Sequence, residues 1–199
     1  STLFPYTTLF RSASKYSVRE QADAWGLARY VYPRFTRVVN ISGRQLDIHK
    51  ADDLVADSEI RNNQIVDDVK QAVESGRTSV ILTKLKRHAE KLYELLKGKA
   101  DHVFLIYGDQ TAKQNQEIKE KMMNVPDNET LVLIATGQKI GEGFNFPRLD
   151  TLMLAAPIKF EGRLIQYVGR LNRLYNGKKD VIVYDYVDVH ILAARKSVV

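Results

Sequence analysis

Thr130-Leu-Val-Leu-Ile-Ala-Thr136 is an unbroken apolar run between two threonines, and this stretch decides the fold. It is too short for a typical helix and lacks the polar alternation of a half-exposed strand. It therefore predicts a strand that is buried on both faces. Similar short apolar runs recur along the chain at 78–83, 102–107, 151–155 and 181–186, and the first of them is rich in β-branched residues.

Helical patterns separate these runs, at 57–73, 86–97, 112–124 and 162–175. Gly76 and Gly98 follow two of them and are typical helix terminators. Buried strands that alternate with helices predict an α/β fold with a mainly parallel sheet covered by helices on both faces. Ligands of such sheets bind outside the carboxyl ends of the strands. Thr83, Gly108, Thr136 and the 162–175 helix are expected at or near that edge.

Composition narrows the class of protein. The chain has 199 residues, 44% of them hydrophobic and 27% charged, which predicts one domain with a substantial core plus an extension. It contains no cysteine, which excludes disulfides and thiolate zinc sites and is typical of a reducing, cytoplasmic setting. No apolar run approaches the ~20 residues that cross a membrane. The net charge of +6 suits a polyanionic partner, although a solvated basic surface explains it equally well.

The ends of the chain differ in character from its middle. The first segment resembles a translated sequencing adaptor, and the next has no sustained period and is interrupted by Pro33. We therefore expect a fragment of a longer protein. Residues 1–12 are expected to be a non-native leader and 13–56 a connector from a preceding domain. Residues 57–190 are expected to form the main domain, and 191–199 a truncated tail.

Gln166-Tyr-Val-Gly-Arg-Leu-Asn-Arg173 carries the clearest functional pattern. In a helix, offsets of zero, three, four and seven place Gln166, Gly169, Arg170 and Arg173 on one face. Two arginines on one face present planar, bidentate cations, and phosphate is the anion that fits them best.

A glycine-bearing loop precedes this helix and follows the 130–136 strand. Thr136 offers a hydroxyl at the strand's end, and Gly137 continues the chain into the loop. Gly141 and Gly143 allow the backbone to turn tightly and to approach a ligand closely. A plain surface loop with one exposed threonine is the alternative interpretation.

The two segments together resemble motifs V and VI of superfamily 2 helicases and translocases. The similarity runs from about 57 to 187, and 32–36 with Arg61-Asn62 resembles DEAD/DEAH-type helicases of bacterial conflict systems. The resemblance implies a RecA-like three-layer sandwich, the second of two such domains in a motor. Arg170 and Arg173, aided by Gln166, would reach the phosphates of ATP.

The resemblance also implies binding roles for the loop. Thr136 and Gly137 would contact a nucleic-acid phosphate. Nucleotide contacts would come from Gly141, Gly143, Asn145 and Gly169. The family usually has aspartate where Asn145 stands, against the ribose, and asparagine can still hydrogen-bond a hydroxyl.

A third candidate region is the start of the 86–97 helix, which resembles motif IV. Thr83 ends a strand there, and Lys84, Lys86 and Arg87 follow it. Unpaired amides at a helix N-terminus favour phosphate, so these residues and Gly108 are predicted to contact nucleic acid. Charged residues in a first helical turn are also often simply solvated.

Missing motifs define the expected mechanism. The sequence contains no Gly-x-x-x-x-Gly-Lys-[Ser/Thr] loop, and no Asp-Glu pair ends a strand. ATP and Mg²⁺ would therefore be held mainly by an N-terminal RecA-like domain of the same full-length protein. The chain alone is predicted to be inactive and to hold no metal. Two alternatives remain open: a non-catalytic nucleic-acid-binding module on this fold, and a small-molecule enzyme whose arginines bind a phosphorylated metabolite.

Overall fold

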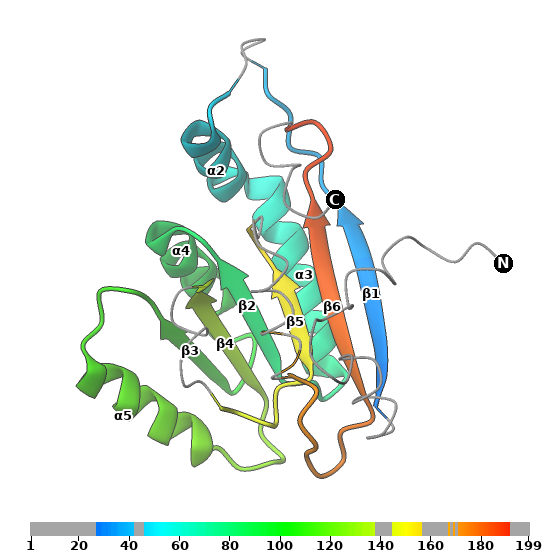
Figure 1. Ribbon diagram of the computed structural model, residues 1–199, viewed down its shortest axis with the longest axis vertical. Helices are drawn as coiled ribbons and strands as arrows, with labels where there is room; N and C mark the ends of the chain where they lie inside the picture. Colours follow the sequence, from blue (N-terminus) through cyan, green and yellow to red (C-terminus); the bar gives the residue numbers. More distant parts are fainter. Residues whose placement is uncertain are drawn as a thin grey trace, which may run out of the picture.

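One parallel sheet organises the molecule. The computed structural model describes residues 27–41, 46–137, 145–156, 167, 169 and 171–191. In this part of the chain, six strands follow the order β1-β6-β5-β2-β4-β3, and every neighbouring pair is parallel (Figure 1). Their bounds are Ala28–Phe35 for β1, Ser79–Thr83 for β2, His102–Ile106 for β3, Leu131–Thr136 for β4, Thr151–Leu154 for β5 and Asp180–Val187 for β6.

The helices begin and end at recognisable signals. They are α2 (Ile48–Asp57), α3 (Glu59–Glu74), α4 (Lys86–Leu96) and α5 (Ala112–Met123). Thr111 and Gln114 form a capping box at the start of α5. Gly98 follows α4 with a φ of +71°, the left-handed conformation that glycine adopts without strain. Predicted helices 57–73, 86–97 and 112–124 are thus confirmed, with ends shifted by one or two residues.

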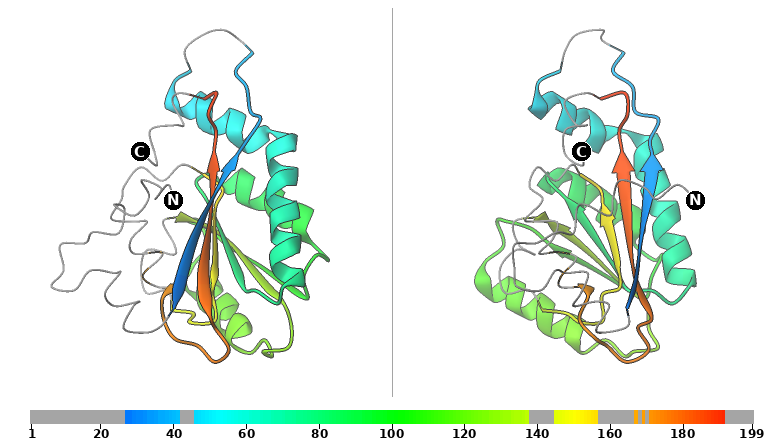
Figure 2. Two further views of the ribbon diagram at one scale, coloured as in Figure 1. Left: turned by 90° about the vertical axis from the view of Figure 1, so that its right-hand side faces the viewer. Right: turned by 45° about the vertical axis from the view of Figure 1, so that its right-hand side comes forward.

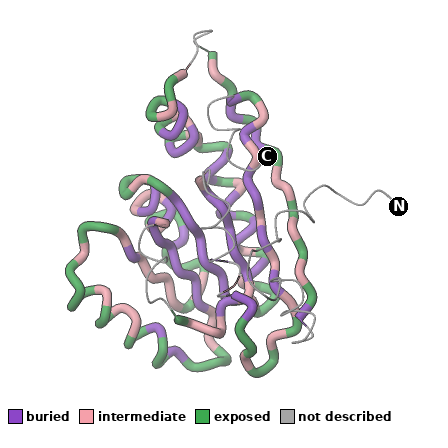
Figure 3. The backbone as a smooth tube through the Cα atoms, viewed as in Figure 1, coloured by how far each residue is buried: buried purple, intermediate pink, exposed green. Residues whose placement is uncertain are grey.

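Side chains alternate along the central strands and create a core on each side of the sheet. On β4, Leu131, Leu133 and Ala135 pack with Met122 of α5 and with Leu171. Val132 and Ile134 point the other way, toward α3 and α4. Figure 2 shows α3 and α4 on one face of the sheet, and Figure 3 shows that the central strands are almost entirely buried. The predicted three-layer α/β sandwich is confirmed.

Strand β1 lies where the sequence predicted a connector. It pairs with β6, and the Arg34 guanidinium binds the carboxylate of Asp68 on α3 at 2.9 and 2.6 Å. Pro33 interrupts no inner ladder because β1 is an edge strand, where a missing N–H is tolerated. Residues 28–35 are therefore part of the sheet. The sequence excluded a helix around Pro33, and a strand at this position agrees with that.

Helix α2 also falls within the predicted connector, and α3 starts directly after it. At that junction Arg61 is 0% exposed. Its Nε donates to Asp188 Oδ1 at 2.9 Å and its Nη1 donates to the Ala155 carbonyl at 2.8 Å. Thr36 donates to the same carboxylate oxygen at 2.6 Å. The start of α3 is therefore fixed to the carboxyl ends of β1, β5 and β6.

Candidate functional site

Two threonines end neighbouring strands at the centre of the sheet. Thr83 of β2 and Thr136 of β4 are partners in the parallel register. Both are buried, with exposures of 3% and 7%. Gly137 follows Thr136 directly, and Gly108 follows β3 after one residue and is exposed. The sheet thus gathers these four predicted residues at the carboxyl ends of three adjacent strands.

A buried hydrogen-bond relay fixes the hydroxyl of Thr83. Asn62 Nδ2 donates to the Ala56 carbonyl at 2.9 Å. Asn62 Oδ1 lies 2.8 Å from His88 Nε2, and His88 Nδ1 lies 2.7 Å from Thr83 Oγ1. Burial lowers the pKa of His88 to about 3, and the cations Arg61, Lys91 and Arg87 act in the same direction, so the imidazole is neutral.

The chemistry of these side chains determines which atom donates and which accepts in each hydrogen bond of the relay. The Ala56 carbonyl can only accept, which orients the Asn62 amide and leaves its oxygen toward His88. His88 Nε2 must then carry the proton, and Nδ1 must accept from the Thr83 hydroxyl. Thr83 therefore presents lone pairs rather than a proton at this edge.

The predicted basic residues at the start of α4 are all engaged by carboxylates. Lys84 binds Asp52, and Arg87 binds Asp57 and, at 2.6 Å, Asp53. These three aspartates lie on α2, which sits beyond the carboxyl ends of the strands beside α4 (Figure 1).

Lys86 belongs to the same group. Its Nζ lies 3.1 Å from Asp109 and 4.5 Å from the centre of the Tyr107 ring. Lys86 and Arg87 are exposed on the surface. Exposed ion pairs contribute at most about 1 kcal/mol each, so a polyphosphate can exchange with these carboxylates.

Two hydrogen bonds join residues of the predicted glycine-bearing loop to residues of the predicted 162–175 helix, the arginine-bearing helix. The Tyr167 hydroxyl donates to the Gly137 carbonyl, and Arg173 Nη1 donates to Asn145 Oδ1. A Cβ on Gly137 would lie 3.2 Å from the Tyr167 oxygen, so any larger residue there would require the tyrosine hydroxyl to shift by a few tenths of an ångström. Asn145 and Arg173 are both exposed. The structure therefore brings together one residue from each of the two predicted motifs.

Of the predicted 162–175 helix, the structure describes only residues 167, 169 and 171–175. Tyr167 reaches Gly137 just after β4, but the far end of the helix contacts Lys178, which also binds the carbonyls of Pro147 and Leu149 just before β5. Tyr167 thus lies by the carboxyl end of β4, whereas Leu171 and Arg173 lie by the amino end of β5.

Four predicted residues, Gly141, Gly143, Gln166 and Arg170, lie outside the described residues. Gly169 is described, and a Cβ built on it meets no heavy atom within 4 Å. Open space at this position leaves room for a ligand beside the helix.

Sequence reasoning missed the supporting residues of this site. Tyr167 and Lys178 bind backbone carbonyls, and such partners leave no pattern in a sequence. His88 and Asn62 are 26 residues apart. The turn at Gly177, where φ is +79°, directs Lys178 back to Leu171.

The described residues offer neither a cluster of metal ligands nor a helix suited to crossing a membrane. They include no group of three or more His, Asp or Glu side chains placed to hold a metal ion. None of their helices has the length and apolar character needed to span a membrane.

Comparison with known proteins assigns the family. Residues 61–175 match the model of the helicase conserved C-terminal domain. This match covers more than half of the chain, and the chain belongs to that family. A relative from Invertebrate iridescent virus 6, named "Putative helicase 161L", is 35% identical over 142 residues, which make up 67% of this chain and 30% of the relative.

Solved structures show the same fold at low sequence identity. UvsW of T4 superposes with a TM-score of 0.61 and 17% identity, over 81% of this chain and 32% of that one. The Sulfolobus solfataricus SWI2/SNF2 ATPase core in complex with dsDNA gives 0.55 and 13%, over 81% and 41%. The chain thus spans less than half the length of each of these three proteins.

Proposed function

We propose that this chain is the C-terminal motor domain of an ATP-dependent nucleic-acid helicase or translocase. ATP would bind between it and an N-terminal RecA-like domain of the same full-length protein. The observation that carries the proposal is the contact between Arg173 and Asn145, which joins the two helicase-like motifs at an exposed position. Membership of the helicase C-terminal family and the likeness to ATPase cores support it.

The arginines would act on the phosphates of ATP. A guanidinium offers a planar fork that matches phosphate oxygens, and an exposed Arg173 held at one side by Asn145 keeps its other donors available. In a continuous helix, the sequence offsets would place Arg170 and Gln166 on the same face as Arg173. Arg170 and Arg173 would stabilise the charge that develops on the γ-phosphate, with Gln166 helping to position it.

The nucleotide itself would rest mainly on the other domain. Asn145 can hydrogen-bond a ribose hydroxyl, and the open space at Gly169 admits a ligand close to the helix. Gly141 and Gly143 would let the loop backbone approach the nucleotide. Mg²⁺ neutralises phosphate charge in such reactions, and the carboxylates that hold it are assigned to the N-terminal domain.

The nucleic-acid track would follow the carboxyl edge of the sheet. Phosphate only accepts hydrogen bonds, and the Thr83 proton is committed to His88, so we assign the phosphate contact to the Thr136 hydroxyl and the Gly137 amide. Lys86 and Arg87 would exchange their exposed carboxylates for phosphates, and Lys84, held by the buried Asp52, would lie beside the same track. Thr83 and Gly108 would line the same edge.

Steady-state ATPase of the two-domain protein tests the proposal, with Arg173→Lys as the variant. Arginine fingers contribute on the order of 10³–10⁵ in rate, and lysine lacks the planar fork. Turnover stimulated by single-stranded oligo-dT should therefore fall by orders of magnitude, while ATP affinity changes much less. Arg37→Lys, at an exposed arginine beyond β1, is the matched control and should keep full activity.

Full activity of the Arg173→Lys variant would remove the arginine from the mechanism. Absence of ATPase in the wild-type two-domain protein, together with retained binding of oligo-dT, would instead favour the non-catalytic nucleic-acid-binding module.

A further inference from the structure

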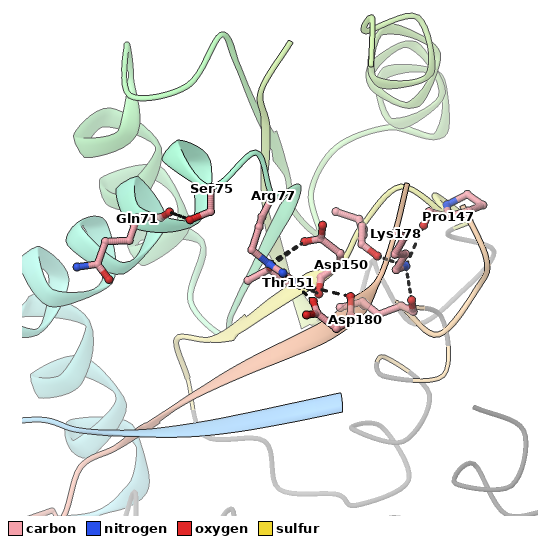
Figure 4. A network of polar contacts seen from close by, with 10 residues as sticks. Gln71, Ser75, Arg77, Pro147, Asp150, Thr151, Lys178 and Asp180 are labelled. Carbon is pink, nitrogen blue, oxygen red and sulfur yellow. Dashed lines mark hydrogen bonds and ion pairs between the residues drawn. The ribbon is translucent and has the colours of Figure 1, made fainter. Parts of the chain in front are cut away.

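Lys178 stands in a tight turn between the arginine-bearing helix and β6. Gly177 adopts a φ of +79°, which reverses the chain, and the Lys178 amide donates to the Tyr175 carbonyl at 3.1 Å. The reversal sends the side chain back over the segments that precede β5 and β6. Figure 4 shows the side chain directed toward Pro147.

The Lys178 ammonium collects four backbone carbonyls from two segments. It binds Pro147 at 3.0 Å and also Leu149, both at the end of the loop that follows β4. It also binds Leu171 and, at 3.2 Å, Arg173, both at the end of the helix. An ammonium has three N–H donors and no acceptor, so at least two of the four carbonyls share one N–H. This environment of acceptors suits a lysine cation and no neutral side chain of the same length.

The helix end explains why a cation is placed there. The last carbonyls of a helix have no partner within the helix, and they carry a partial negative charge. Burial lowers the pKa of Lys178 to about 8, with nearby Asp150 acting in the opposite direction. The side chain therefore remains largely protonated at neutral pH.

A closed arrangement results around Arg173. The Arg173 guanidinium donates to Asn145, the first residue of the 145–149 segment. The Arg173 backbone carbonyl accepts from Lys178, and Lys178 also donates to the carbonyl of Leu149, the last residue of that segment. We propose that Lys178 is a positioning residue that holds Arg173 in register with the loop and so sets the placement of its guanidinium. This inference rests on the proposed role of Arg173 in ATP hydrolysis.

A positioning role for Lys178 differs from a role in fold stability in one respect. The effect of losing Lys178 on activity should depend on whether the Arg173 side chain is present. If Lys178 acts through Arg173, its loss costs nothing further once the arginine side chain is gone. A general packing defect would instead reduce activity by the same factor with or without the arginine. Misplacement of a catalytic group by about 1 Å can cost on the order of 10² in rate.

The test is a double-mutant cycle in the two-domain protein, with kcat and KM for ATP measured at saturating oligo-dT. Lys178→Met should lower kcat about 10–100-fold and change KM less than about twofold. Arg173→Ala should lower kcat further, and the double variant should be no slower than Arg173→Ala. Lys179→Met, at the exposed neighbouring lysine, is the control and should match the wild type.

Chemical rescue keeps the test decisive if Lys178→Met folds poorly. This chain has no cysteine, so Lys178→Cys gives it a single thiol, and in a two-domain protein whose partner domain has been cleared of cysteine it can be alkylated at that one position. Aminoethylation recreates the ammonium and should restore kcat. Hydroxyethylation, of nearly equal length but uncharged, should not.

Each result bears on a separate claim. Equal kcat for the two alkylated proteins, or a Lys178→Met effect that persists in full beside Arg173→Ala, would overturn the positioning role. Full activity of Arg173→Ala itself would overturn the proposed function, whatever Lys178 does.

Discussion

Replacement of His88 by glutamine tests the relay at the carboxyl edge through the pH dependence of folding. Burial lowers the pKa of His88 from 6.5 to about 3. Between these values the unfolded chain binds a proton that the folded chain does not, so acid removes stability. The contribution is complete above the unfolded pKa, and about 1.4 kcal/mol is lost for each pH unit below it.

Asp185 acts in the opposite direction within the same range. Burial and the neighbouring Asp188 raise its pKa from 3.8 to about 6, so the folded chain binds the proton first and acid stabilises it. From about pH 7.5 to about pH 5, linkage gives a loss of ~2 kcal/mol for His88 and a gain of ~1.4 kcal/mol for Asp185. The two contributions partly offset one another in the wild type and leave a net loss of ~0.6 kcal/mol, whereas His88→Gln keeps the gain from Asp185 without that loss.

Urea unfolding of the 199-residue chain at a series of pH values measures the difference. The free energy of unfolding of His88→Gln, relative to the wild type, should rise by ~2 kcal/mol as the pH falls over this range. His49→Gln, at an exposed histidine on α2, is the control and should differ from the wild type much less. Parallel curves for His88→Gln and the wild type would refute the buried neutral imidazole and, with it, the committed proton of Thr83.

Three further changes probe the edge and its supports. Thr136→Ala in the two-domain protein should weaken binding of oligo-dT by about 1.5–3 kcal/mol, measured by fluorescence anisotropy, because one charge-assisted hydrogen bond is lost; unchanged affinity in a folded variant would contradict the track. Gly137→Ala should lower the thermal midpoint of the chain, because the added Cβ lies 3.2 Å from the Tyr167 oxygen and such overpacking costs about 1–3 kcal/mol; an unchanged midpoint would show that Tyr167 moves freely. Asp188→Asn should cost about 3–5 kcal/mol in urea unfolding, because it leaves the fully buried Arg61 without its carboxylate; a loss below about 1 kcal/mol would argue against that anchor.

The fold was largely predictable because its signals are local. Continuous apolar runs such as 131–136 can be satisfied only by burial on both faces, and terminators such as Gly98 mark helix ends within a few residues. Strand β1 lacked both kinds of signal. Its exposed tyrosines, Tyr30 and Tyr32, and its proline suit an edge strand, and an edge strand is recognised only once its neighbour β6 is in place.

The candidate site was predictable in its residues but not in its contacts. Asn145 and Arg173 were each identified from motif resemblance, and only the folded chain shows that they touch. The carboxylates that occupy Lys84 and Arg87 come from α2, about 30 residues earlier in the chain. The role of Lys178 could not be predicted from the sequence, because its partners are main-chain carbonyls, which every residue possesses.

ATP turnover with and without an N-terminal partner domain tests the central claim most directly. The measurement compares magnesium-dependent ATPase of the isolated chain with that of the chain joined to its N-terminal RecA-like domain, each with and without oligo-dT. The account predicts no turnover by the isolated chain and turnover stimulated by nucleic acid in the joined protein. Appreciable ATPase by the pure isolated chain, or a joined protein that hydrolyses no ATP in the presence of nucleic acid, would contradict the account.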